Sequence, residues 1–355
     1  MTPKFHNLTV KDIRKETRDT VSISFLIPEE LELDYHFESG QYLTLKTSIN
    51  NEEVRRSYSL CSSPFEKEWR VAVKQIENGV FSTYANKVLK IGDKLDVMTP
   101  AGNFKVTTGT NKKSYVLFAA GSGITPVFSI AKTILEDENG DVTLFYGNKG
   151  FHGIIFREEL EALKNKYLDR LRVIHIFSRE SPGNKIQKGR INKEKCGDLY
   201  NAFLKNQNID EVFICGPEDM ILNIRESLIE NGVESSKIHF ELFATNIKKE
   251  KKIEVIGKES PSFASKVQII VDGDTIDFEL DSNGLTILDA AQEAGADLPF
   301  ACKGGVCCTC KAKILEGSAK MDVNYALMPD EVENGYILTC QAHPTSEKLL
   351  VSFDD

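Results

Sequence analysis

The stretch Ala301-Cys-Lys-Gly-Gly-Val-Cys-Cys-Thr-Cys310 holds four of the chain's eight cysteines. Three of them follow the pattern Cys302-x4-Cys307-x2-Cys310, and 29 residues then separate Cys310 from Cys340. Four thiolates hold a two-iron, two-sulfide cluster at this plant-type spacing, with three ligands in one tight loop and the fourth from a distant segment. The sequence therefore predicts a [2Fe–2S] site at Cys302, Cys307, Cys310 and Cys340.

Two other interpretations of these cysteines stay open: a structural zinc site and a group of reduced thiols without metal. Zinc sites usually take two separate, closely spaced ligand pairs, whereas Cys340 has no nearby partner cysteine. Gly304 and Gly305 let the backbone approach a cluster and direct N–H groups at its sulfurs. Cys308 is expected to be a neighbour of the cluster and not a ligand. The chain starts without a secretory signal, so we expect a cytoplasmic protein and no disulfide framework.

Composition is that of a globular protein, with 41% hydrophobic and 27% charged residues among 355. No run of about 18 apolar residues predicts a membrane span, and a net charge of −9 argues against nucleic-acid binding. Phe263–Asp355 contains 6 Lys, no Arg and 16 Asp or Glu, a net charge of −10, so the other 262 residues sum to +1. This acidity suggests a surface that docks on a basic partner, although solubility alone would also explain it.

The pattern of strands and helices changes along the chain, and we expect three domains joined by one linker. Short strands with Gly and Pro turns predict an antiparallel barrel or sandwich at the start. Alternating strands and helices then predict an open parallel sheet. A lysine-rich tether and a β-grasp-like α+β cysteine domain follow. The expected boundaries are 1–107, 108–245, 246–262 for the linker and 263–355.

The second domain opens with Tyr115-Val-Leu-Phe-Ala-Ala-Gly-Ser-Gly-Ile-Thr-Pro126, a strand that runs through Gly121-x-Gly123 into a helix. Glycines let backbone N–H groups approach a pyrophosphate, and the helix N-terminus favours its charge. Thr125 and Pro126 belong to the same turn. Proline has no backbone N–H, which costs little in the first turn of a helix, where that group would have no partner. A plain tight turn is the alternative for Gly-x-Gly alone, but the strand–turn–helix context favours a dinucleotide site.

The third strand of this sheet is followed by Ser178 and Arg179, and no ribose-binding acid stands at the usual position. A hydroxyl and a guanidinium there suit a 2′-phosphate, because Arg binds phosphate through two parallel hydrogen bonds. The sequence thus favours NADPH, with NADH possible. A solvated basic loop is the alternative.

Further motifs lie at matching places in the chain: Arg56-x-Tyr58-Ser59, Gly79-x-x-Ser82 and Cys215-Gly216-Pro217. In this order, together with the Gly121 turn, residues 1–245 resemble the ferredoxin–NADP reductase superfamily. The last 90 or so residues resemble a plant-type ferredoxin, mainly through the register of the four cysteines. The whole chain is similar to the reductase components of multicomponent oxygenases, most of all to those of phenylacetyl-CoA epoxidase systems.

The resemblance implies an FAD site, with FMN as the alternative, and roles for the matching residues. Tyr58 would stack on the isoalloxazine, Ser59 would lie near its N5, and Phe243 would cover its other face unless it is a core residue. Cys215, with Gly216 and Pro217, would lie near the nicotinamide. The flavin phosphates would be held by Arg56, Gly79, Val80, Ser82 and Thr83.

The hypothesis is an NAD(P)H-dependent oxidoreductase that passes electrons from NADPH through FAD and the [2Fe–2S] cluster to an oxygenase component. A flavin links two-electron and one-electron chemistry, which explains why the three sites occur together. Ser59 and Cys215 would shape the contact of nicotinamide and flavin, and the acceptor would dock near the acidic C-terminal domain. Other interpretations are a reductase for a ring-hydroxylating dioxygenase or another redox acceptor, a non-enzymatic electron carrier and a redox sensor.

Overall fold

The computed structural model of the protein describes residues 4–107, 112–137, 140–243 and 262–354. The chain divides into two compact units. The larger contains Phe5–Pro100 and Phe104–Phe243, and the smaller is built chiefly from the C-terminal residues. The expected linker, 246–262, lies outside the described residues except for its last position.

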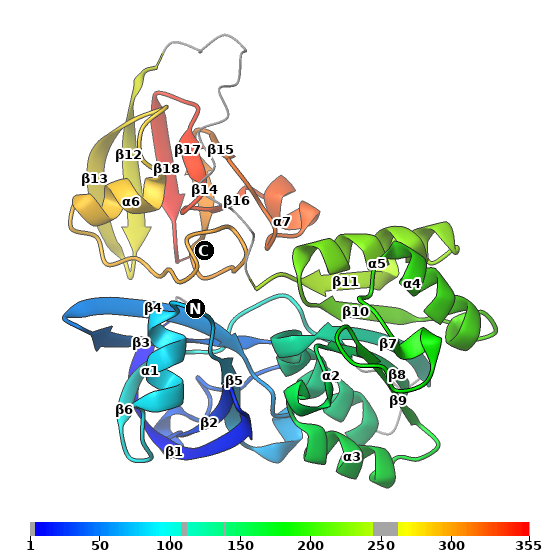
Figure 1. The fold of residues 1–355 in the computed structure, drawn as a ribbon. Helices are drawn as coiled ribbons and strands as arrows, with labels where there is room; N and C mark the ends of the chain where they lie inside the picture. The colour runs from blue at the N-terminus through cyan, green and yellow to red at the C-terminus, as the bar shows by residue number, and fades with distance from the viewer. Residues whose placement is uncertain (1–3, 108–111, 138–139, 244–261, 355) are drawn as a thin grey trace. The chain divides into compact units, whose positions relative to one another are not determined.

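The first part of the larger unit is a six-stranded antiparallel sheet in the order β4-β3-β6-β1-β2-β5 (Figure 1). The sheet curls until Leu60, directly after β4, bridges Val71 in β5, which brings its two outer strands together as a barrel. Helix α1 packs the buried side chains of Phe81 and Ala85 against this barrel. Its elements are β1 (Phe5–Thr17), β2 (Thr20–Leu26), β3 (Tyr42–Ile49), β4 (Glu52–Ser59), β5 (Trp69–Lys74), α1 (Val80–Lys87) and β6 (Lys94–Met98).

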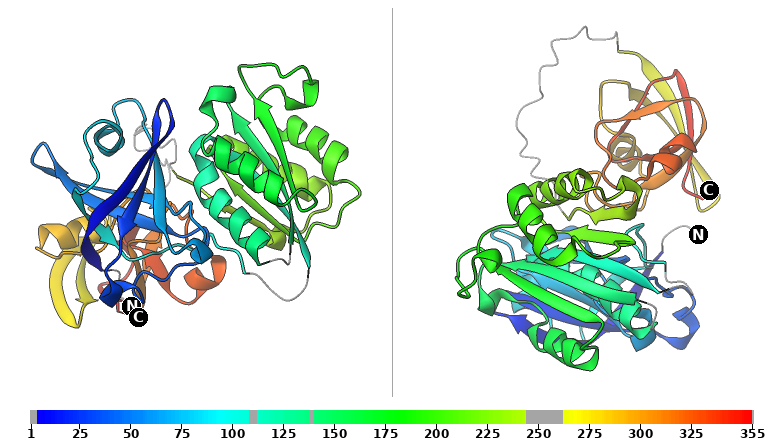
Figure 2. Two further views of the ribbon diagram at one scale, coloured as in Figure 1. Left: turned by 90° about the horizontal axis from the view of Figure 1, so that it is seen from below. Right: turned by 90° about the vertical axis from the view of Figure 1, so that its right-hand side faces the viewer.

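The second part is a parallel sheet in the order β11-β10-β7-β8-β9, with helices on both faces (Figure 2). The strands are nearly continuous apolar runs because both faces are buried. The chain starts at the central strand β7, builds outward through β8 and β9, and then returns to the other side. Its elements are β7 (Lys113–Ala120), α2 (Ile124–Glu136), β8 (Gly140–Asn148), α3 (Arg157–Lys166), β9 (Leu171–Phe177), α4 (Lys193–Leu199), β10 (Glu211–Cys215), α5 (Glu218–Glu230) and β11 (Ile238–Glu241).

Polar contacts join the barrel to helix α2 of the parallel-sheet part. The Ser129 hydroxyl donates to the carbonyl of Ser62 over 2.6 Å, and the Lys132 ammonium donates to the Glu66 carboxylate. Ser129 is fully buried, so its bond is shielded from water, whereas the ion pair joins a nearly buried Lys132 to a partly exposed Glu66. The two parts therefore pack as one unit.

The smaller unit has a five-stranded sheet in the order β13-β12-β18-β14-β16, in which β12 and β18 run parallel. Helix α6 begins at the cap Thr286 and packs Ile287, Leu288 and Ala291 onto one face of this sheet. Its elements are β12 (Ala264–Val271), β13 (Asp274–Asp281), α6 (Ile287–Glu293), β14 (Lys311–Glu316), β15 (Ala319–Met321), α7 (Pro329–Glu333), β16 (Tyr336–Leu338), β17 (Ala342–Pro344) and β18 (Lys348–Ser352).

These architectures confirm the expected fold classes: an antiparallel barrel, a parallel α/β sheet and a β-grasp-like α+β domain. Within the described ranges, no helix has both the length and the apolar character needed to cross a bilayer.

Tyr35 stabilises the barrel from inside and generates a first prediction. Its side chain is fully buried, its hydroxyl donates to the carbonyl of Val97 over 2.6 Å, and its own carbonyl accepts from the indole of Trp69. Tyr35→Phe should lower the free energy of unfolding of the larger unit by about 1–2 kcal/mol, because it leaves a buried carbonyl short of a donor. Urea titration can follow this through the fluorescence of Trp69, the chain's single tryptophan.

Tyr200→Phe is the matched control, since its hydroxyl bonds to the Asn231 carbonyl at the surface over 3.2 Å. That change should cost less than about 0.5 kcal/mol. Equal effects of the two substitutions would contradict the role given to Tyr35.

Candidate functional site

The expected flavin-binding residues of the barrel lie at the end of β4. Tyr58 is half-buried, and its ring centre lies 5.5 Å from that of Phe81 in α1, with the planes tilted by 33°. Burial raises the pKa of Tyr58, so its phenol stays neutral over the working pH range. Arg56, two residues earlier, is exposed and donates to the carbonyl of Arg55. The strand thus offers an aromatic face beside a free cationic end, which suits a flavin and its phosphates.

The loop before α1 is held by side chains of the first turn of this helix. The Ser82 hydroxyl accepts from the backbone N–H of Ile76 over 3.2 Å, and the Thr83 hydroxyl accepts from Gln75 over 3.3 Å. A Cβ on Gly79 would lie 2.3 Å from the Ser82 oxygen, so this position needs glycine. Ser82 and Thr83 therefore shape the loop, and the N–H groups of the first turn of α1 remain to bind phosphate.

The Gly121 turn lies between β7 and α2. Gly121 has φ +55°, and a Cβ on Gly123 would lie 2.2 Å from the carbonyl oxygen of Cys215, so helix α2 can start this close to β10 only with glycine here. The Thr125 hydroxyl donates to the carbonyl of Ser122 over 3.0 Å, and Pro126 is buried. Thr125 and Pro126 thus build the turn, while Gly121 and Ser122 are partly exposed.

The barrel and the parallel sheet meet at a hydrogen bond between Ser59 and Glu241. The Ser59 hydroxyl donates to the Glu241 carboxylate over 3.1 Å. Glu241 ends β11, and the parallel pairing of β10 with β11 places it directly beside Cys215. The structure therefore brings together Ser59 and Cys215, the two residues expected to shape the hydride-transfer contact.

Glu241 is a site residue that sequence reasoning missed. Its side chain is only half-buried by surface area, but desolvation by the surrounding protein raises its pKa to about 8, against the opposing effect of the hydrogen bond from Ser59. Burial, reinforced by the Glu241 charge, likewise raises the pKa of Cys215, whose thiol is fully buried and neutral. The available signal was a carboxylate inside the otherwise apolar strand end Phe240-Glu-Leu-Phe243.

The other expected residues around this contact lie at the same edge of the sheet. Gly216 packs against Met220, and Pro217 is the N-cap of α5. Phe243 follows β11 and is 39% exposed, so its ring is not a core residue.

Ser178 and Arg179 lie on the opposite side of β7 from Cys215. Both are exposed after β9, and their backbone N–H groups donate to the carbonyls of Asn148 and Lys149, each over 2.9 Å. A nucleotide bound along this edge would span from Arg179, across the Gly121 turn, to Cys215. Ligands bind at such a point, where the strand order reverses.

In the smaller unit, the four expected cluster ligands converge from the cysteine loop and from the segment after β16. The sulfurs of Cys302 and Cys307 lie 3.2 Å apart, and the thiols of Cys310 and Cys340 share a hydrogen bond. Hydrogen bonds from Cys307 and Cys340 lower the pKa of Cys302. The four thiols thus form one connected group, from Cys307 through Cys302 and Cys340 to Cys310, which fits the four thiolate ligands of a two-iron cluster.

Backbone and amide donors surround these sulfurs. The N–H of Gly304 points at the Cys302 sulfur over 3.3 Å. The Gln341 amide lies 3.8 Å from the Cys340 sulfur and donates to the carbonyl of Lys303 over 3.1 Å. Cys308 instead directs its thiol at the carbonyl of Ala326. None of the eight cysteines, all of which lie in described residues, forms a disulfide, so the four expected ligand thiols are reduced.

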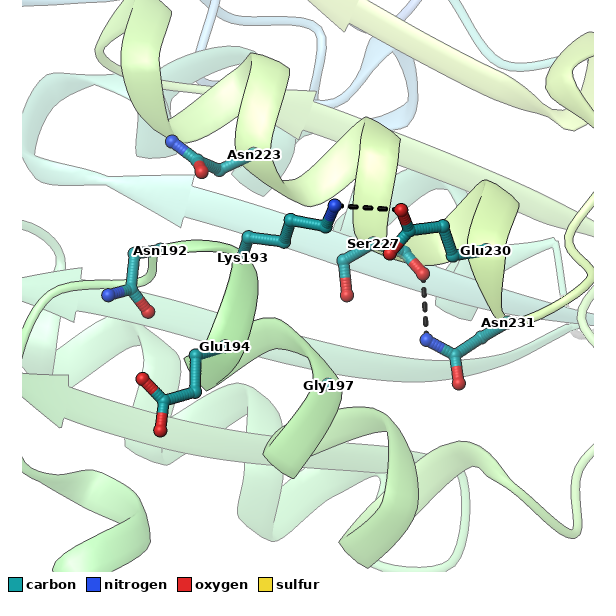
Figure 3. A pocket seen from close by; sticks show the side chains of 8 residues that line it. All are labelled: Asn192, Lys193, Glu194, Gly197, Asn223, Ser227, Glu230 and Asn231. Atoms are coloured by element: carbon teal, nitrogen blue, oxygen red, sulfur yellow. Dashed lines mark hydrogen bonds and ion pairs between the residues drawn. The ribbon is translucent and has the colours of Figure 1, made fainter.

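A hollow of about 540 Å³ between α4 and α5 shares no residue with these sites (Figure 3). Lys193 spans it to Glu226 and Glu230 over 2.8 and 2.7 Å. Its lining is polar and open to solvent, so we assign it no part in cofactor binding. It is lined by Asn192, Lys193, Glu194, Gly197, Asn223, Ser227, Glu230 and Asn231.

Comparison with known families agrees with the three sites. Residues 7–106 match the oxidoreductase FAD-binding domain, residues 117–226 the oxidoreductase NAD-binding domain, and residues 269–345 the 2Fe-2S iron-sulfur cluster binding domain. The chain is 42% identical to a subunit of the 1,2-phenylacetyl-CoA epoxidase of Escherichia coli K12, over 99% of this chain and 98% of that protein. It is 34% identical to the ferredoxin reductase component of a 3-ketosteroid-9-alpha-monooxygenase from Rhodococcus rhodochrous, over 98% and 96% of the two chains.

The chain belongs to the reductase components of multicomponent oxygenases. Its fold matches the solved phthalate dioxygenase reductase with a TM-score of 0.61, at 24% identity and over 98% of both chains. This reductase is therefore an oxidoreductase with FAD, NAD(P)H and [2Fe–2S] sites, and its electrons pass to an oxygenase component.

The raised pKa of Glu241 predicts a pH-dependent stability. Its ordinary pKa is 4.5 and its folded value about 8, so the folded reductase binds this proton more tightly than the unfolded chain does. The resulting stabilisation is complete below about pH 4.5 and is lost as the pH rises through 8. In Glu241→Gln this decline should disappear, as measured by the melting temperature from Trp69 fluorescence between pH 5 and 9.

Glu158→Gln serves as control, because that side chain is 90% exposed and its loss should leave the profile unchanged. If the wild type instead gained stability relative to Glu241→Gln between pH 5 and 8, the carboxylate would be stabilised and not desolvated.

Proposed function

We propose that this reductase takes hydride from NADPH and delivers single electrons to an oxygenase of the phenylacetyl-CoA epoxidase kind. The observation that supports hydride transfer is the hydrogen bond from Ser59 to Glu241, which lies beside Cys215. It joins the strand end expected at the flavin to the strand end expected at the nicotinamide. The identity of 42% to the epoxidase component over nearly the whole chain supports the acceptor. A bound flavin supplies the exchange between two-electron and one-electron chemistry.

In this proposal the residues bind, orient and exclude water. Tyr58 supports one face of the isoalloxazine and Phe243 covers the other, while Ser59 approaches N5. Arg56 and the first turn of α1 hold the flavin phosphates. Cys215 contributes a small, uncharged wall against the nicotinamide, because its buried thiol is protonated and is no nucleophile.

We propose the same division of the chain as the sequence predicts: 1–107, 108–245, linker 246–262 and 263–355. The three family matches support it, since each falls inside one of these ranges.

The acidic smaller unit is the proposed docking surface for the oxygenase. Its edge strand β13 exposes the side chains of Asp274, Asp277, Glu279 and Asp281. A row of carboxylates on an edge strand discourages strand pairing and favours a basic partner.

Anaerobic titration of the purified protein with NADPH tests the electron path. Visible absorbance should show the flavin bleaching, and EPR should show the signal of a reduced [2Fe–2S] cluster. Cys340→Ser should abolish the EPR signal and leave the bleaching intact, because the smaller unit packs separately. A flavin that stays oxidised would favour a non-enzymatic electron carrier. Zinc in place of iron would refute the cluster. Slow reduction of cytochrome c would favour a redox sensor.

Arg179→Ala tests the preference for NADPH. Loss of a charge-assisted contact to the 2′-phosphate should raise the KM for NADPH about tenfold and leave the KM for NADH nearly unchanged. Arg172→Ala is the matched control, since Arg172 is exposed near the amino end of the same strand. Equal changes for both nucleotides would count against the assignment.

A further inference from the structure

Phe151 is an exposed aromatic ring at the carboxyl edge of the parallel sheet. It begins the short turn Phe151–Gly153 after β8, and 49% of its surface is exposed. Exposure alone is common, since Phe65 on the barrel is 59% exposed. The position of Phe151 is what matters, because an open aromatic face at the edge where ligands bind can stack on a base. Neither the expected flavin residues nor the expected nicotinamide residues include it.

Glu180 fixes the place of this ring. Its carboxylate accepts the backbone N–H of Phe151 over 2.9 Å. Gly150 allows this approach, since a Cβ there would lie 2.0 Å from the same carboxylate. The turn after β8 is thereby tied to the residue that follows Arg179, the proposed partner of the 2′-phosphate.

Arg157 fixes the orientation of the ring. This first residue of α3 places its guanidinium 4.8 Å from the ring centre of Phe151. A cation over one face of an aromatic ring is attracted by its π-electrons. The phenyl group is therefore backed on one side and oriented, while half of its surface remains open.

The order of the strands indicates which part of a dinucleotide reaches Phe151. The Gly121 turn follows the central strand β7, and Cys215 and Glu241 end β10 and β11 on one side of it. Strands β8 and β9 lie on the other side. With the nicotinamide at Cys215 and the pyrophosphate at Gly121, the adenosine half extends over the ends of β8 and β9, where Phe151 lies.

We propose that Phe151 is the stacking platform for the adenine ring of the nicotinamide nucleotide. The proposal rests on the proposed function and adds a binding residue for the non-reacting half of the substrate. A base presents a flat π-face regardless of the ribose phosphate, so Phe151 contributes to NADPH and NADH alike. Arg179, by contrast, discriminates between them.

The test compares ligands with and without adenine on the flavin-loaded, full-length reductase. In Phe151→Ala, the dissociation constants of NADPH, NADH and 2′,5′-ADP should each rise about fivefold or more, equivalent to about 1 kcal/mol of lost base stacking. Calorimetry with 2′,5′-ADP reads this without electron transfer. Reduced nicotinamide mononucleotide, which lacks adenosine, should reduce the flavin at the wild-type rate. Phe151→Trp should restore the affinity for all three adenine ligands.

Phe65→Ala is the matched control, because Phe65 is 59% exposed on the barrel and is given no part in either site. Unchanged binding of 2′,5′-ADP in Phe151→Ala would overturn the proposal. Equally slowed flavin reduction by the mononucleotide would also overturn it, because that result would place the ring at the nicotinamide. Slowed electron delivery to an acceptor, with unaltered nucleotide binding, would overturn it too and would make Phe151 a partner contact. A wild-type flavin that no reduced nicotinamide reduces would refute the proposed function, whereas the calorimetric result would still decide the adenine contact.

Discussion

Hydride transfer requires the reacting atoms to lie about 3–3.5 Å apart, and the larger unit holds together the two strand ends at which the proposed flavin and nicotinamide sites meet. Ser59 ends a barrel strand and Glu241 ends a strand of the parallel sheet, 182 residues later. Their hydrogen bond alone would not set the distance. The shielded bond from Ser129 to Ser62 and the ion pair of Lys132 with Glu66 fix helix α2 against the barrel as well. Because α2 starts at the Gly121 turn, the same contacts place this turn relative to the barrel.

Motifs with a fixed spacing or place along the chain generate predictions from the sequence, and contacts set by strand register do not. The four cysteines follow a ligand spacing, and Ser178 and Arg179 directly follow an apolar strand. Fold class also followed from local patterns, since short alternating strands and continuous apolar strands have different periods. Glu241 was missed because its meaning depends on being paired with Cys215 across β10 and β11. The role proposed for Phe151 likewise depends on contacts with Glu180 and Arg157 that exist only in the folded chain.

The environment of the four expected cluster ligands is built within the smaller unit. Lys303 is tied to α6 through Asp289, and its carbonyl accepts from Gln341, next to Cys340. The loop and the fourth ligand are thus joined by a side chain whose amide also reaches a ligand sulfur. Hydrogen bonds to sulfur tune cluster potentials, and for one electron about 30 mV corresponds to only about 0.7 kcal/mol. One amide is therefore enough to change the balance between flavin and cluster.

Charged side chains of the proposed cofactor sites lie where phosphates would bind, whereas neutral groups surround the proposed hydride contact. Arg56 and Arg179 are exposed and lie where phosphates would bind. Around the proposed hydride contact, burial instead keeps the Tyr58 phenol and the Cys215 thiol neutral. Electrostatic interactions are strongest where water is excluded, so a fixed charge there would bias the flavin in both of its redox states. Glu241 resolves this conflict, because a pKa of about 8 leaves it mostly protonated at neutral pH and lets it ionise only in alkaline solution.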